Sequence, residues 1–187
     1  MTLFKRVTLP AFFVFASIAG ANVLEAQTRA MTGFCPVTIL DGGEWKKGDV
    51  EIKSTYDNRT YYFVSAEAKK KFDKYPPKYV PALGGDCIIC LVNVGKRIEG
   101  SVFHSVRHKD RLYLFPQDRA KKVFTDEPEK FENADLALDG KCPVCKKGGS
   151  DEKGKPEFTV IVADMRYQMA SKEIMEEFKR NPKNYVR

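Results

Sequence analysis

The sequence lacks the residue sets that common catalytic sites require. It has two histidines in 187 residues, and it contains no Ser-His-Asp set, no paired-carboxylate motif and no phosphate-cradling glycine loop. The pairs Gly84-Gly85 and Gly148-Gly149 are typical of turns. We therefore expect that this protein is not an enzyme.

A hydrophobic run long enough to span a membrane is also missing. The apolar run from Leu9 to Ala19 is shorter than the roughly 20 residues that a membrane-spanning helix needs. It follows Lys5 and Arg6, which is typical of a secretory signal peptide, here residues 1–26. We expect cleavage after Ala26, with Ala21 as the alternative, and a periplasmic or secreted product without a membrane anchor.

Neither sign of charge dominates the chain strongly. The full sequence has 32 basic and 25 acidic residues, for a net charge of +7. Many lysines, such as Lys69 to Lys71 and Lys121 to Lys122, fall in one predicted helix of a repeated unit, which indicates a solvated helix face. We expect no nucleic-acid partner. An anionic envelope surface is compatible with the charge, and no protein partner is marked by the sequence.

The chain repeats one template three times. The copies share a glycine, aromatic residues and a proline at identical internal spacing: Gly48, Tyr61, Phe63, Phe72, Pro76, Tyr79; Gly100, Tyr113, Phe115, Phe124, Pro128, Phe131; Gly154, Tyr167, Met169, Phe178, Pro182, Tyr185. A Gly-x-Cys precedes each copy at Cys35, Cys87 and Cys142. We name residues 31–81, 83–132 and 138–187 repeat 1, repeat 2 and repeat 3.

Each repeat is predicted to form a β-hairpin followed by a helix. Turn-forming residues recur at one position between two strand-like runs, at Asn58, Asp110 and Asp164. Ser65 and Ser171 are suited to cap the following helix. The helix is expected to end before the shared proline, which cannot continue a helix interior. The aromatic residues are interpreted as core.

This arrangement resembles the YHS domain, a relative of the TRASH metal-binding modules, over essentially the whole mature chain. The residues that carry the resemblance are Cys-Pro-Val at 35–37 and 142–144, the stretch from Tyr61 to Phe72, and the closing Pro-x-x-aromatic. The resemblance implies an α+β fold of three small treble-clef-like modules. It also implies that binding of zinc or copper is the first function to test.

The chain departs from the complete module at the ligand positions. A full module has Cys-x-x-Cys before the hairpin and Cys-x-x-x-Cys at the helix start, which together give a tetrahedral site. The second pair is replaced in every repeat, by Val64 and Ala68, Pro116 and Ala120, and Ala170 and Ile174. Thr38 also replaces a cysteine in repeat 1, which leaves Cys35 without a partner. Units without such a staple are marginal alone, so we expect the three repeats to pack together.

Residual metal binding is the first of three functional hypotheses. Cys87, Cys90, Cys142 and Cys145 would meet across the interface of repeats 2 and 3, or His104 and His108 would complete a site with the first pair. The two histidines share a face if their strand is regular. Soft thiolates favour zinc or cuprous copper.

Thiol–disulfide chemistry and a structural role are the other two hypotheses. A reactive cysteine usually needs the N-terminus of a helix, and the motif from Cys142 to Cys145 is expected to precede a loop, Lys146 to Ser150, and no helix. In the third hypothesis both pairs close as disulfides in a non-catalytic interaction module.

Overall fold

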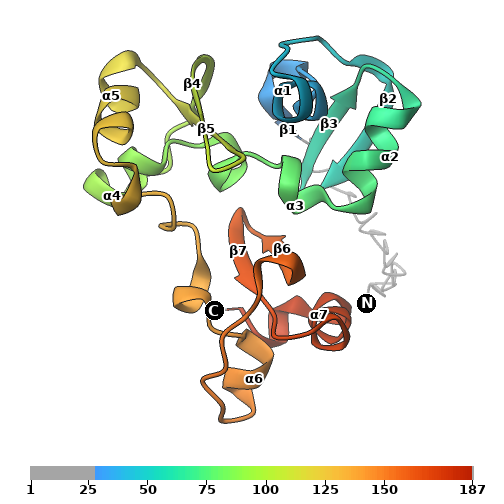
Figure 1. Ribbon diagram of the computed structural model, residues 1–187, viewed down its shortest axis with the longest axis vertical. Helices are drawn as coiled ribbons and strands as arrows, with labels where there is room; N and C mark the ends of the chain where they lie inside the picture. Colours follow the sequence, from blue (N-terminus) through green and yellow to red (C-terminus); the bar gives the residue numbers. More distant parts are fainter. Residues whose placement is uncertain (1–27, 187) are drawn as a thin grey trace, which may run out of the picture.

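The computed structural model describes residues 28–186, so the predicted signal peptide lies outside the described residues. The fold is α+β, with three separate small sheets, each followed in the chain by a helix (Figure 1). Among the described helices, none combines the length and the apolar character needed to cross a membrane.

The elements follow the same order in each repeat. The first repeat and its N-terminal flank comprise β1 (Thr28–Arg29), η1 (Ala30–Gly33), α1 (Pro36–Gly42), β2 (Asp49–Tyr56), β3 (Arg59–Phe63), α2 (Ala66–Lys74) and α3 (Pro76–Tyr79). The second comprises η2 (Ala82–Gly85), α4 (Ile88–Val94), β4 (Ser101–His108), β5 (Arg111–Phe115), α5 (Asp118–Asp126) and η3 (Pro128–Lys130). The third comprises η4 (Ala137–Gly140), α6 (Pro143–Lys147), η5 (Pro156–Phe158), β6 (Thr159–Val162), β7 (Met165–Gln168), α7 (Lys172–Arg180) and η6 (Pro182–Asn184).

The three hairpins have the tight turns that the sequence predicts. In repeat 1, Tyr56 pairs with Arg59, so that Asp57 and Asn58 form a two-residue turn with φ of 47° and 60°. Both values lie in the left-handed region, which a type I′ hairpin turn requires. The equivalent turn residues of the other hairpins also have positive φ.

The first glycine of the template is required by a close approach between chain segments. A Cβ atom at Gly48 would collide with the backbone of Tyr62 and Phe63, and one at Gly100 or Gly154 would collide with the backbone of the second strand in the same way. Only glycine leaves room for this crossing. The steric requirement explains why the residue recurs at one position in all three repeats.

Each nine-residue helix that follows a hairpin covers an aromatic core. The Ser65 hydroxyl accepts a hydrogen bond from the Ala68 amide at 3.2 Å, and Ser171 caps α7 in the same way. Phe72 is 1% exposed and lies against Tyr61 and Phe63, with ring centroids 4.8 and 5.1 Å apart. The predicted caps and the core role of these aromatic residues are therefore confirmed.

The expectation that the motif from Cys142 to Cys145 precedes a loop and no helix is wrong, because α6 begins inside the motif and extends to Lys147. A short helix begins directly after Cys35, Cys87 and Cys142, as α1, α4 and α6. Proline at the first helical position of α1 and α6 has a backbone φ already suited to a helix. Gly43 and Gly95 close α1 and α4 in the left-handed conformation.

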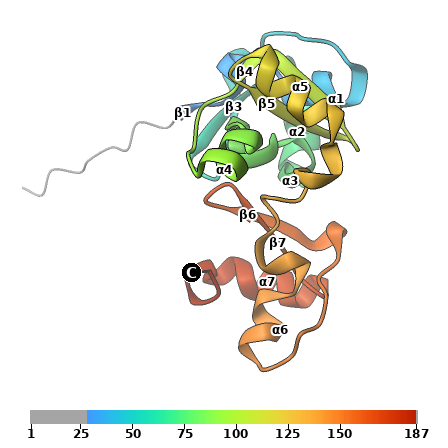
Figure 2. The same cartoon turned by 90° about the vertical axis from the view of Figure 1, so that its left-hand side faces the viewer.

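Repeat 2 packs the outer face of its hairpin on repeat 1. Tyr113 and Phe115 point into the core of repeat 2, whereas Leu112 and Leu114 alternate with them along β5 and join the core of repeat 1. The first two repeats lie side by side, and the third lies beyond them with its hairpin directed at their junction (Figures 1 and 2).

Ion pairs fix the hairpin of repeat 3 at that junction. The Asp57 carboxylate accepts a hydrogen bond from the Asp164 amide at 2.6 Å, and the Asp164 carboxylate accepts from Arg59 at 3.1 Å and from Arg97 at 2.6 Å. The three repeats thus meet at one turn.

A second, more deeply buried ion pair links repeats 2 and 3. Asp135, in the linker between them, is 1% exposed and accepts hydrogen bonds from Arg111 at 2.6 Å and Arg166 at 2.8 Å. Burial alone would raise the pKa of Asp135, but the two guanidinium charges outweigh it and hold this pKa below its usual value.

Candidate metal centres

The two Cys-x-x-Cys motifs have the same local geometry. The sulfur of Cys87 accepts a hydrogen bond from the Cys90 amide at 3.3 Å, and the sulfur of Cys142 accepts one from the Cys145 amide at 3.3 Å. In each pair the first cysteine is fully buried and the second is partly exposed. The Sγ atoms of Cys142 and Cys145 lie 2.7 Å apart. Each motif therefore presents two neighbouring sulfurs at the start of a short helix.

Two of these thiols are held protonated near neutral pH. Burial, together with the adjacent sulfur of the pair, raises the pKa of Cys87 and of Cys145 to about 12, because a second negative charge there is unfavourable. The helices α4 and α6 do not offset this effect. Cys87 and Cys145 consequently lack the low pKa that distinguishes reactive cysteines.

Apolar side chains stand where the complete module has its other two ligands. Ala170 and Ile174 belong to the same apolar cluster as Cys142 and Cys145. In repeat 1 the missing cysteine is replaced by Thr38, whose hydroxyl donates to the carbonyl oxygen of Cys35 at 3.1 Å. Ala170, Ile174 and Thr38 therefore offer no sulfur ligand beside these cysteines.

The two histidines point to different partners. His104 is hydrogen bonded through Nδ1 to Asp118 at 2.9 Å, and His108 through Nε2 to Glu132 at 2.6 Å. The His108 ring also packs edge-on against Phe124, with centroids 5.7 Å apart. The pairing of β4 with β5 shifts register between Ser101 and Ser105, so β4 is not a regular strand. The expectation that His104 and His108 share a face required a regular strand.

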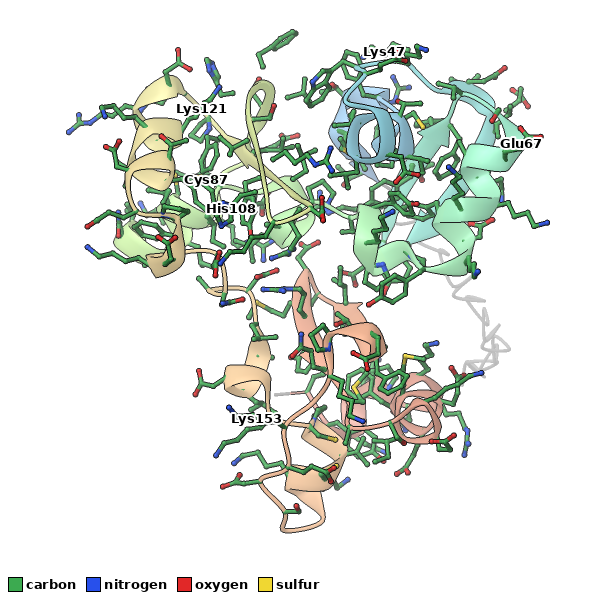
Figure 3. The ribbon with its side chains drawn as sticks, in the orientation of Figure 1. Lys47, Glu67, Cys87, His108, Lys121 and Lys153 are labelled. Carbon is green, nitrogen blue, oxygen red and sulfur yellow. The ribbon has the colours of Figure 1, made fainter. Side chains whose placement is uncertain are left out.

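The structure does not bring the six candidate ligands together. Cys87 and Cys90 lie in the cluster of repeat 2, whereas Cys142 and Cys145 lie in that of repeat 3. Figure 3 shows Cys87 and His108 in repeat 2, and Lys153 marks the separate body of repeat 3. Within residues 28–186, no group of three or more His, Cys, Asp or Glu side chains is placed to hold a metal ion.

The number and type of ligand atoms decide which metal ion each of the two cysteine pairs could hold. Structural zinc takes four ligands in a tetrahedron, and two sulfurs with apolar neighbours do not fit that requirement. Cuprous copper is softer and is selected by thiolates. The two sulfurs of each Cys-x-x-Cys do not make a closed zinc site, and cuprous copper is the metal whose preference for sulfur agrees with this donor set.

Comparison with known proteins adds no information on function, so a function can be argued only from the residues described above. No family model and no solved structure matches this chain.

Sequence reasoning missed the arginines that join the repeats. Arg59 and Arg111 occupy the same template position, directly after the hairpin turn, and each binds a carboxylate from outside its own hairpin, Asp164 and Asp135. The signal that could have revealed them is this shared position. Their partners were not evident because they lie 105 and 24 residues away in the chain.

Proposed function

We propose that this protein is an exported, non-catalytic, three-repeat protein of YHS-like, treble-clef-like modules that binds cuprous copper at two separate dithiol sites. Cys87 with Cys90 forms one site, and Cys142 with Cys145 forms the other. The neighbouring sulfurs of Cys142 and Cys145, one buried and one partly exposed, carry the proposal, since they place two soft donors together near the surface. The two sulfurs must move apart from their 2.7 Å separation to admit an ion between them.

The high pKa of Cys87 and of Cys145 supports a binding role over catalysis. Thiol–disulfide exchange requires a thiolate nucleophile, and a pKa of about 12 for Cys87 and Cys145 keeps that species scarce at neutral pH. Copper binding must release the thiol protons, so the apparent affinity should rise with pH between about 6 and 9.

A cuprous copper titration of the mature chain tests the proposal. The titration is done under anaerobic, reducing conditions with a chromogenic copper chelator as competitor. We expect the wild-type chain to bind two copper ions. The Cys90→Ser variant and the Cys145→Ser variant should each bind one. Cys35→Ser is the matched control and should still bind two, because its cysteine has no neighbouring thiol.

Zinc uptake and oxidation state distinguish the competing functions. Stoichiometric zinc binding that is lost in His104→Ala or His108→Ala would instead indicate a mixed histidine site. Failure to bind copper, with both pairs found as disulfides that resist glutathione, would indicate the interaction module. The sulfur proximity in repeat 3 also favours that closed form, which makes the mass of the unreduced protein an essential measurement.

A further inference from the structure

A cavity of about 510 Å³ opens on repeat 3, away from the junction of the repeats. Its walls include Ala137 and Leu138 of η4, Tyr167 of β7 and Tyr185 near the C-terminal end. Figure 2 shows α6 and α7 at the end of the molecule opposite repeats 1 and 2. The volume is in the range of small-molecule sites, which span roughly 300–1,000 Å³.

The equivalent surface of repeat 1 is closed. The template aligns Ala137 with Ala30, Leu138 with Met31, and Tyr185 with Tyr79. In repeat 1 these positions are 2%, 6% and 4% exposed, because η1 and α3 contact strands β4 and β5 of repeat 2. Leu138 is instead 39% exposed. Among the described residues, no further repeat covers repeat 3.

Two lysines change the chemistry of this surface. Lys146 and Lys147 of α6 line the cavity at the positions that Ile39 and Leu40, both 3% exposed, occupy in repeat 1. The Lys147 ammonium donates to the Asn184 carbonyl oxygen at 3.3 Å and lies 5.1 Å from the centre of the Tyr185 ring. At these two positions repeat 3 therefore has exposed lysines, whereas repeat 1 has buried apolar side chains.

The charged side chains that line this cavity are both lysines, and the nearest carboxylates lie outside the lining. The Tyr185 hydroxyl donates to the Glu177 carboxylate at 2.8 Å. Lys146 shares the exposed carboxylate of Asp151 with Lys141. The described lining residues include no carboxylate. An occupant that complements the walls has an apolar or aromatic body that lies on Leu138 and the tyrosines, and an anionic head that faces the lysines.

We infer that the repeat 3 cavity is a binding site for a small amphiphilic carboxylate. The carboxylate head accepts hydrogen bonds from Lys146 and Lys147, and the acyl or aryl body fills the space that a neighbouring hairpin fills in repeat 1. The site shares α6 with Cys145, but its lining includes no cysteine, so each proposal can fail its test without the other.

The experiment is calorimetric titration of the mature protein with decanoate below its micellar concentration and with 4-phenylbutyrate. We expect one saturable site for at least one of them. Decylamine, which has a similar body and the opposite charge, should not compete. Lys146→Ala/Lys147→Ala should weaken binding at least about tenfold, since two charge-assisted hydrogen bonds are lost. Leu138→Glu should do the same by placing a carboxylate at the half-exposed rim.

Two control variants test whether binding is specific to this cavity. Lys121→Ala/Lys122→Ala removes the same charge from α5, on which Figure 3 labels Lys121, and should leave the affinity unchanged. Cys35→Ser should also leave it unchanged, because Cys35 lies in the core of repeat 1. The inference is wrong if neither carboxylate binds saturably, if decylamine binds equally well, or if the lysine variant retains full affinity. Self-association that the lysine variant abolishes, seen by sedimentation, would instead make this face an interface with a second copy.

Discussion

Repeat 1 and repeat 3 share one framework but differ in the residues after the first cysteine. Repeat 1 has threonine where repeats 2 and 3 have a second cysteine. Val37, Ile39 and Leu40 of its helix α1 are buried in a core that strands of the other repeats complete. Repeat 3 keeps Cys145, exposes Lys146 and Lys147, and has a smaller buried cluster. The difference indicates that apolar packing between repeats can replace the staple that a small module otherwise needs.

The aromatic residue at the centre of each repeat gives the strongest test of this difference. Phe72→Ala in repeat 1 should destabilise the protein by about 4–5 kcal/mol, and Phe178→Ala in repeat 3 by about 3 kcal/mol, since a cavity in a tightly enclosed core collapses less. Urea unfolding followed by circular dichroism measures both values. A larger loss for Phe178→Ala would contradict the view that repeat 1 has the more enclosed core.

The Asp135 ion pair should account for much of the attachment of repeat 3. Asp135→Asn leaves two buried guanidinium groups without their counter-charge, so we expect a loss of about 3 kcal/mol. Unfolding should also separate into two transitions as repeat 3 uncouples. Asp151→Asn, at the exposed ion pair with Lys141 and Lys146, is the control and should produce no measurable change. One unchanged cooperative transition in Asp135→Asn would show that apolar contacts alone hold repeat 3.

Low pH should weaken the ion pairs of Asp135 with Arg111 and Arg166. The pKa of Asp135 is lower in the folded protein than its usual value of 3.8. Its ionised form therefore stabilises the fold fully above the unfolded-state pKa, and this contribution is lost as the pH falls through the folded-state pKa. Urea midpoints measured from about pH 5 down to about pH 2 should fall more steeply for the wild type than for Asp135→Asn. If the urea midpoints of the wild type and of Asp135→Asn fell with pH to the same extent, ionised Asp135 would not be the group that stabilises the fold.

The smallest expected effect concerns one tyrosine position of the template. Among the described residues, the buried Tyr61 hydroxyl has no hydrogen-bond partner, whereas the equivalent Tyr113 hydroxyl donates to the Glu132 carbonyl oxygen at 3.1 Å. Tyr61→Phe should stabilise the protein by about 1 kcal/mol, and Tyr113→Phe should destabilise it by about the same amount. Thermal unfolding measures both variants. Shifts of the same sign would show that the hydrogen bond of Tyr113 does not distinguish the two positions.

Local sequence patterns predicted much of each repeat. The turn residues at Asn58, Asp110 and Asp164, the caps at Ser65 and Ser171 and the buried aromatic residues all depend on short-range preferences, which act within a few residues. The helices α1, α4 and α6 were not predicted because five to seven residues carry too little periodicity to be recognised.

The candidate site was only partly accessible from sequence. The pairing of Cys87 with Cys90 and of Cys142 with Cys145 follows from their spacing, and both pairs occur as local units. Whether the two pairs meet depends on how repeats 2 and 3 dock, which is a long-range property. The same is true of His104 and His108, whose partners are set by the irregular pairing of β4.

The amino-acid sequence alone specifies the threefold template, the hairpin-and-helix unit and the absence of cysteine from the helix that follows each hairpin, because spacing and turn chemistry are local. Three features arise only when the repeats pack: the two cysteine pairs lie in separate cores, Arg111 and Arg166 converge on Asp135, and repeat 3 keeps an open cavity. These features depend on which surface of one repeat faces the next. The packing of the repeats is determined by burial and charge pairing between residues that are far apart in the chain.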